Sequence, residues 1–253
     1  MVSLHEIVKG VSRTKPLYLE DSYLKEYYCK VLRYVKDKGK RGYIVLDQSI
    51  FHPKFGGQPS DKGIIKGKEF TFTVKKVLLY SDVLVHWGKV EGIEPSLLED
   101  VVCKIDWDLR YKVMKLHTAG HILDYCLFKV YGKTINTLSA FHGPPTPYLA
   151  YQASIPNSEV LKKIENLANE IIKKGINVVI KWVSKNELKQ NIINAPNLGR
   201  LPENDKYRIV MIDGLNAMPC TGTHVKNTSE IGKIVISGVE EIVDGFKLFY
   251  NLG

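Results

Sequence analysis

The sequence has few cysteines and no long apolar segment. Its four cysteines, Cys29, Cys103, Cys126 and Cys220, are scattered through 253 residues, which excludes the dense disulfide framework of small secreted proteins. No run of about 18 apolar residues occurs, so we expect no transmembrane helix. The N-terminus, MVSLHEIVKG, lacks the apolar core of a signal peptide. These absences favour a reducing, cytoplasmic location, where a cysteine near histidines is more often a metal ligand or a nucleophile than half of a disulfide.

Acidic residues are scarce relative to basic ones. The chain has 27 Asp and Glu residues against 36 Lys and Arg residues, which gives a formal net charge of +9. Such an excess favours polyanionic partners, because each contact with a phosphate releases condensed counterions. A generally lysine-rich proteome would give the same value. Candidate phosphate contacts are the segment KDKGKR at 36–41 and the lysine pairs at 162–163 and 173–174, and each is equally compatible with solvated surface.

Strand-like segments dominate the first hundred residues. They are short, rich in β-branched and aromatic residues, and separated by turn signals such as FGGQPSDKG. Several such strands at close spacing predict a small barrel. After Asp108 the apolar residues recur with helical spacing as far as about Tyr131.

The second half alternates helices with strands. A second helix is expected in the segment that begins after Asn157 or Ser158, either of which can cap it, and that ends at Gly175. Strand-like segments then fill most of the remaining chain. We therefore predict an α+β fold, with a small β-barrel in residues 1–108 and an α/β layered domain with an antiparallel sheet in residues 109–253.

Two histidines in the first predicted helix have the spacing of a metal-binding pair. In HTAGH, His117 and His121 are four residues apart, so they share one helix face at about 6 Å and can reach one ion. The alternatives are a pair of surface histidines or one buried histidine bound to backbone. The HExxH metalloprotease motif needs a Glu beside the first ligand, and Thr118 occupies that position here, which excludes the protease interpretation.

A second pair of metal-capable residues follows about a hundred positions later. In CTGTH, Cys220 and His224 come after Pro219, so we expect a turn at the end of a strand. One thiolate and three imidazoles form a tetrahedral set suited to zinc, and four protein ligands are typical of a structural site. Alternatively, Cys220 is a buried free thiol and His224 an exposed side chain, or Cys220 is a nucleophile beside a histidine.

The two motifs lie within longer stretches that resemble one family. HTAGH followed by PCTGTHVKNTSEIG is similar to the editing domain of alanyl-tRNA synthetases and to its free-standing relatives, the AlaX proteins. DWDLRYKVMKLHTAGHIL, in which Arg110 and Met114 precede the histidines, resembles the helix that carries the first pair. FHPKFGGQPSDKG resembles the glycine-rich loop of the preceding barrel. The resemblance covers nearly the whole chain and is nearest to the medium-length AlaX type.

The resemblance implies a reaction, a cofactor and a partner. The family hydrolyses tRNA(Ala) mischarged with serine, and in some members with glycine, so charged tRNA(Ala) is the expected partner. It implies one Zn²⁺ per chain, held by His117, His121, Cys220 and His224. It also implies that the loop residues Gly56, Gly57 and Gln58 lie near the site.

Thr118, Thr223 and Gln58 are the candidates to bind the serine hydroxyl, because a site that hydrogen-bonds a hydroxyl strongly rejects the analogue that lacks it. For each threonine, a local backbone hydrogen bond is the alternative. Zinc would either activate a water molecule or position the substrate, and four protein ligands favour positioning.

The sequence departs from the family pattern at three positions. Thr221 replaces a glycine and is expected to narrow the pocket or restrict the turn. Asn216 stands near a common aspartate, and His52 stands where tyrosine is frequent. The alternative functions are a non-catalytic tRNA-binding module with a structural zinc, and a hydrolase of another charged tRNA, as in threonyl-tRNA synthetases. The GGQ loop favours the alanine branch.

Overall fold

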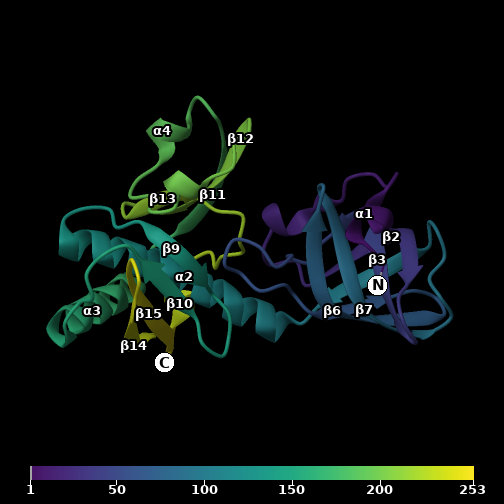
Figure 1. Ribbon diagram of the computed structural model, residues 1–253, viewed down its shortest axis with the longest axis horizontal. Coiled ribbons are helices and arrows are strands. Elements are labelled where there is room, and N and C mark those ends of the chain that lie inside the picture. The colour runs from purple at the N-terminus through teal and green to yellow at the C-terminus, as the bar shows by residue number, and fades with distance from the viewer. Residues whose placement is uncertain (1) are drawn as a thin grey trace. The chain divides into compact units, whose positions relative to one another are not determined.

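The computed structural model describes residues 2–253, except the side chain of Arg200, and the chain forms two compact units (Figure 1). The units are Met1–Tyr111 and Lys112–Gly253. Helix α2, Trp107–Tyr131, runs through the point of division. The domains 1–108 and 109–253 therefore stay a prediction.

The first unit is built on a closed six-stranded barrel, as the strand-like segments predicted. Its strands pair antiparallel in the order β2-β3-β7-β6-β5-β8. Alternate residues point inward, as in β6, where Phe70, Phe72 and Val74 are buried in the barrel core. The strands are β2 Glu26–Lys36, β3 Arg41–Leu46, β5 Gly63–Lys66, β6 Phe70–Tyr80, β7 Val83–Gly92 and β8 Asp100–Ile105.

Short elements complete this unit. Helix α1, Leu4–Val8, begins after Ser3, whose side chain accepts the N–H of Glu6 at 3.2 Å. Its buried Ile7 and Val8 form a second apolar cluster with outward residues of β3 and β7. This helix was not predicted, because five residues carry too little periodicity. The other short elements are β1 Lys15–Pro16, η1 Leu17–Leu19 and β4 Gln48–Ser49.

The second unit combines helices with two antiparallel sheets, which confirms the predicted α+β class. The predicted helix before Gly175 is α3, Ser158–Lys174, with Asn157 as its N-cap and Gly175 in a left-handed conformation at φ 62°. One sheet has the order β14-β15-β10-β9 and the other β11-β12-β13. Their strands are β9 Thr137–Phe141, β10 Tyr148–Tyr151, β11 Val178–Ser184, β12 Lys206–Ile212, β13 Asn216–Pro219, β14 Ile234–Ile242 and β15 Gly245–Leu252.

The connections of the second unit hold three short helices, α4 Leu188–Asn191, η2 Leu198–Arg200 and η3 Thr228–Ile231. Strands β9, β10 and β13, of four or five residues each, were not predicted, because segments so short have no clear period. No helix among residues 2–253 combines the length and apolarity required to cross a membrane.

Candidate metal centre

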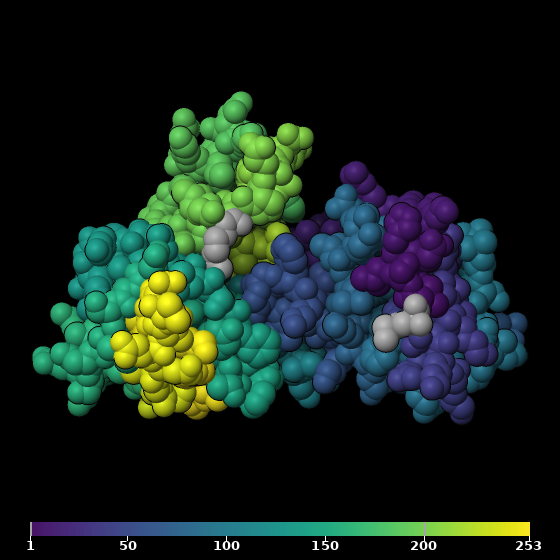
Figure 2. Space-filling model, viewed as in Figure 1, coloured from purple at the N-terminus to yellow at the C-terminus, as the bar shows by residue number. Residues whose placement is uncertain are grey.

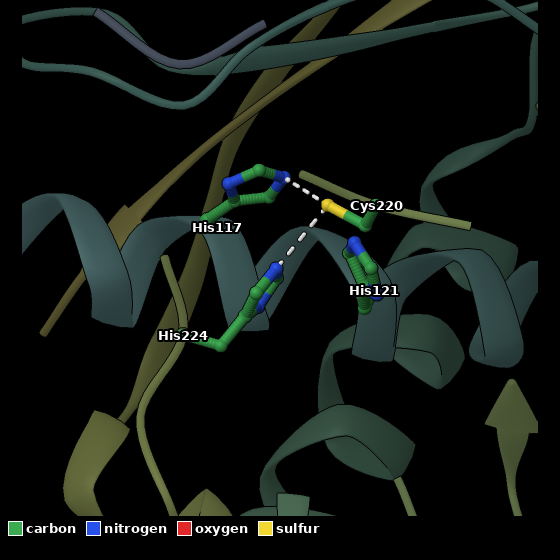
Figure 3. Close-up of side chains that lie close together, drawn as sticks. All are labelled: His117, His121, Cys220 and His224. Carbon is green, nitrogen blue, oxygen red and sulfur yellow. Dashed lines mark hydrogen bonds between the residues drawn. The ribbon is translucent and has the colours of Figure 1, made fainter. Parts of the chain in front are cut away.

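Four side chains from two distant segments converge in the second unit. His117 and His121 come from α2, and Cys220 and His224 come from the segment that follows β13 (Figure 3). Their potential ligand atoms all lie within 4.8 Å of one another. The Cys220 Sγ atom is 3.5 Å from His117 Nε2 and 3.3 Å from His224 Nε2. The motifs noted in the sequence therefore form one cluster.

The donor set of the cluster can hold a metal ion, and its distances can be compared with those of a zinc site. Zn–S and Zn–N bonds of about 2.3 and 2.0 Å at tetrahedral angles place sulfur and nitrogen about 3.6 Å apart. The two sulfur–nitrogen distances at Cys220 are close to this value. The longer separations, up to 4.8 Å, would have to shorten by about 1 Å on metal binding. One soft and three borderline donors in a closed arrangement fit zinc better than calcium or magnesium.

The backbone around Cys220 is fixed by a buried arginine. Arg208 in β12 is 2% exposed, and its Nη1 donates to the carbonyls of Cys220 at 2.7 Å and Gly222 at 3.0 Å. The Cys220 N–H donates to the Arg208 carbonyl at 3.0 Å. Asn216 Nδ2 donates to the carbonyl of His121 at 2.6 Å, which ties β13 to the metal-site helix. These bonds hold the downstream ligands against α2.

The hydroxyl of Thr118 orients His224. Thr118 is fully buried, and its Oγ1 donates to the carbonyl of Met114 at 2.9 Å. The hydroxyl has one proton, so it accepts at its 3.1 Å contact with His224 Nδ1. His224 is thus protonated at Nδ1, and its Nε2 lone pair faces Cys220. Val225 N also donates to Thr118 Oγ1 at 3.3 Å. Most metal-binding histidines likewise hydrogen-bond a protein group through the ring nitrogen that does not face the metal.

Burial keeps His121 in the protonation state that binds metal, and it acts in the opposite sense on Cys220. Burial, helped by the nearby charge of Arg208, lowers the pKa of His121 to about 3, so its imidazole is neutral at physiological pH. Burial also raises the pKa of the Cys220 thiol, while Arg208 and the Gly222 N–H, 3.4 Å from Sγ, oppose this. A neutral imidazole is the ligating form of histidine, and a bound metal deprotonates a coordinating thiol.

The side chains of His142 and Tyr250 support the ring of His117. The His142 ring stacks on the His117 ring at 4.1 Å between centroids with 14° between planes. His142 Nδ1 donates to Tyr250 Oη at 2.7 Å, and Tyr250 Oη donates to the carbonyl of Leu116 at 3.1 Å. Gly120 leaves room for this ring, because a Cβ at that position would lie 2.6 Å from His142 Cε1. Burial, and then His121, lower the pKa of His142 to about 3.

The glycine-rich loop lies in the first unit. Gly56 and Gly57 have φ angles of 58° and 79°, and they form the two-residue turn between Phe55 and Gln58. A turn with two positive φ angles strongly favours glycine at both positions, which explains the GG pair. Gln58 is 1% exposed.

A buried ion pair fixes the base of this loop. The His52 N–H donates to Asp61 Oδ2 at 2.6 Å, and the Asp61 N–H donates to the His52 carbonyl at 3.0 Å. Arg110, fully buried, holds both carboxylate oxygens of Asp61 and donates to the carbonyls of Ser22 and Ile50. A guanidinium with this many partners rigidifies the loop.

The remaining predicted positions differ in their surroundings. Thr223 is fully buried beside His224. Thr221 is exposed. Arg208, His142 and Tyr250 were not predicted as part of the site. No local pattern marks them, because they contact the cluster or each other only across long separations in the chain.

Two family descriptions match parts of this chain. Residues 25–109 match "tRNA synthetases class II (A)", and residues 207–248 match "Threonyl and Alanyl tRNA synthetase second additional domain". The second match contains Cys220 and His224.

The chain is also similar to full-length proteins. It is 36% identical over 248 residues to an alanine–tRNA ligase of Pyrobaculum aerophilum, covering 96% of this chain and 27% of the ligase. It is 36% identical over 253 residues to the alanine–tRNA ligase of Sulfurisphaera tokodaii, covering 98% of this chain and 27% of the ligase. The alanyl-tRNA editing protein AlaX-L of Pyrococcus horikoshii is 34% identical over 221 residues, covering 87% of this chain and 53% of AlaX-L. The chain thus spans about a quarter to a half of the length of these relatives.

Proposed function

Since this chain is homologous to the editing region of alanyl-tRNA synthetases and to AlaX-L, we propose that it hydrolyses tRNA(Ala) mischarged with serine, with the glycine ester as a second candidate substrate. The reaction is cleavage of the ester between the amino acid and the tRNA 3′ end. The observation that carries the proposal is the convergence of His117, His121, Cys220 and His224 in one buried cluster. The proposed partner is therefore charged tRNA(Ala).

We propose that the four clustered side chains hold one Zn²⁺. Bound there, the ion would supply a Lewis acid beside the ester. The chain's own residues set the geometry: Thr118 fixes the tautomer of His224, and Arg208 fixes the turn that carries Cys220. Four protein ligands complete a tetrahedral shell, which favours a role in positioning the substrate.

Selectivity for serine over alanine requires a group that pairs with the serine hydroxyl. A buried polar group left unpaired by alanine would make rejection large. Thr223 and Gln58 remain candidates for this contact. The Thr118 hydroxyl contacts Met114, Val225 and His224. Its bond to the Met114 carbonyl supports the alternative that the Thr118 hydroxyl forms a local backbone hydrogen bond.

The proposal is tested by deacylation of three substrates. Purified protein is incubated with Ser-tRNA(Ala), Gly-tRNA(Ala) and Ala-tRNA(Ala), with and without a zinc chelator. We expect the serine and glycine esters to be cleaved, the alanine ester to persist, and chelation to abolish cleavage. Decay of all three at the uncatalysed rate would favour the second candidate, a tRNA-binding module in which zinc only stabilises the fold. Four protein ligands are typical of a structural zinc site, and this observation supports the second candidate.

A further inference from the structure

We propose that one outer face of the barrel binds the phosphate backbone of the tRNA. This inference rests on the proposed function, from which the RNA partner follows. It names the surface of the first unit on which that partner docks. The face lies across strands β8, β5, β6, β7 and β3, which are neighbours in that order. We call it the basic face, and its cations are Lys38, Arg41, Lys62, Lys75, Lys89 and Lys104.

A groove forms one end of the basic face. It has a volume of about 330 Å³, and Lys62, Lys75 and Lys104 line it. All three lysines are exposed, and none of them forms an ion pair with any residue that the structure describes. The groove's one carboxylate, Asp106, accepts the N–H of Leu109 at 3.1 Å and so caps the first turn of α2. Three lysines therefore line a groove whose one carboxylate, Asp106, is hydrogen-bonded to the N-terminus of α2.

A second hollow forms the other end of the basic face. It has a volume of about 490 Å³ and is lined by Lys38, Arg41, Asp37, Tyr43 and Trp87. The indole of Trp87 is partly exposed there. Cations beside an aromatic ring are the combination by which proteins bind backbone phosphates and stack an unpaired base.

The strand register places both hollows on one surface. Thr73 in the groove lies opposite Lys89, and Lys89 lies opposite Arg41 in the second hollow. Since strands are about 4.8 Å apart, Thr73 and Arg41 are separated by about 10 Å along this row. Their neighbours Phe72 and Val74 point into the barrel core, so Thr73 points outward.

The charges on this row favour an anionic ligand. Arg41 and Lys89 are directly opposite on adjacent strands, and like charges in that position repel. Glu91 neutralises part of this charge, with its Oε1 2.7 Å from Lys89 Nζ, and Glu26 lies opposite Lys104. A bound phosphate would reduce the remaining repulsion between Arg41 and Lys89, which Glu91 neutralises only in part. The helix α3, by contrast, mixes its four lysines with Glu159, Glu165 and Glu170 along its length.

The test compares two triple variants of equal charge change. The barrel variant is Lys62→Gln/Lys75→Gln/Lys104→Gln, and the control is Lys162→Gln/Lys163→Gln/Lys173→Gln, which alters exposed lysines of α3. Binding of uncharged tRNA(Ala) is measured by fluorescence anisotropy between 50 and 300 mM salt. We expect the barrel variant to lose about 10- to 100-fold in affinity at 0.1 M salt and its salt slope to fall by about 2 to 3. The control should stay within about threefold of the unmodified chain, and Lys→Arg at the three barrel positions should restore binding.

Three results would overturn the inference. In the first, the barrel variant binds tRNA with the affinity and salt slope of the unmodified chain. In the second, the α3 control loses as much affinity as the barrel variant. In the third, the unmodified chain binds an acidic polypeptide or vesicles of anionic lipid as tightly as tRNA, which would assign the face to another partner. Because binding is measured on uncharged tRNA, absence of deacylation would refute the proposed function and leave this result standing.

Discussion

Thr118 Oγ1 lies 3.1 Å from His224 Nδ1, and this contact sets which imidazole nitrogen of His224 faces the other ligands. We expect Thr118→Val to weaken zinc binding by about 10- to 100-fold, because the Nδ1–H would lose its acceptor and the ring its orientation. Thr118→Ser keeps the hydroxyl and should stay within about threefold. Competition with a chelator of known affinity measures both. Equal zinc affinity in the valine variant would show that the hydroxyl does not orient His224.

His121 is the proposed ligand whose loss we expect to remove metal and activity together. His121→Ala leaves three of the four donors, so we expect zinc content to fall well below one ion per chain and Ser-tRNA(Ala) deacylation to disappear. The control is His5→Ala, which alters an exposed histidine in the first unit. Zinc is counted by elemental mass spectrometry of the purified proteins. A full complement of zinc in His121→Ala would exclude His121 from the site.

Gly120 should tolerate no side chain. A Cβ there would lie 2.6 Å from His142 Cε1 and 2.9 Å from His142 Nδ1, so Gly120→Ala should displace the ring that stacks on His117. We expect a loss of about 1–3 kcal/mol in the free energy of unfolding, measured by urea titration. Gly199→Ala is the matched control, because a Cβ at Gly199 has no atom within 4 Å, and its change should be within about 0.5 kcal/mol.

A double-mutant cycle tests the cause of that loss. In a His142→Ala background, Gly120→Ala should cost much less, because the clashing ring is gone. An equal cost in both backgrounds would show that the clash with His142 is not the reason for glycine at this position.

His86 should make stability depend on pH. It is fully buried in the barrel, its Nδ1 donates to the Ile44 carbonyl at 3.1 Å, and its Nε2 accepts from Ser49 Oγ at 2.8 Å. Burial lowers its pKa to about 4 from the ordinary 6.5. The unfolded chain therefore binds the proton first as pH falls. The stabilisation is complete above pH 6.5 and is lost progressively down to pH 4, by about 3 kcal/mol in total.

The measurement is urea unfolding between pH 4 and pH 8. His86→Gln removes the titrating group, so its stability should fall less steeply below pH 6.5, by up to about 1.4 kcal/mol per pH unit. His5→Gln, at an exposed position, should keep the slope of the unmodified chain. Identical slopes in His86→Gln and the unmodified chain would show that the buried imidazole does not titrate differently on unfolding.

The sequence by itself determined the longer helices, the barrel strands and the metal-capable residues. The alternation of apolar residues predicted the barrel strands, and helical spacing predicted α2 and α3, because both patterns are local consequences of backbone geometry. The same geometry explains why His117 and His121 share a helix face, and why Gly56 and Gly57 form one turn. The composition showed an excess of positive charge, but it did not show on which surface of the protein that charge lies.

The tertiary structure decided what surrounds those residues. Arg208 reaches the Cys220 turn because β12 pairs with β13. The Tyr250 N–H donates to the Pro147 carbonyl, and the Tyr250 hydroxyl contacts His142 Nδ1. Such contacts join residues far apart in the chain, so no periodicity or spacing contains them. The roles of Thr118 and of the barrel lysines likewise depend on neighbours that strand register and helix packing supply.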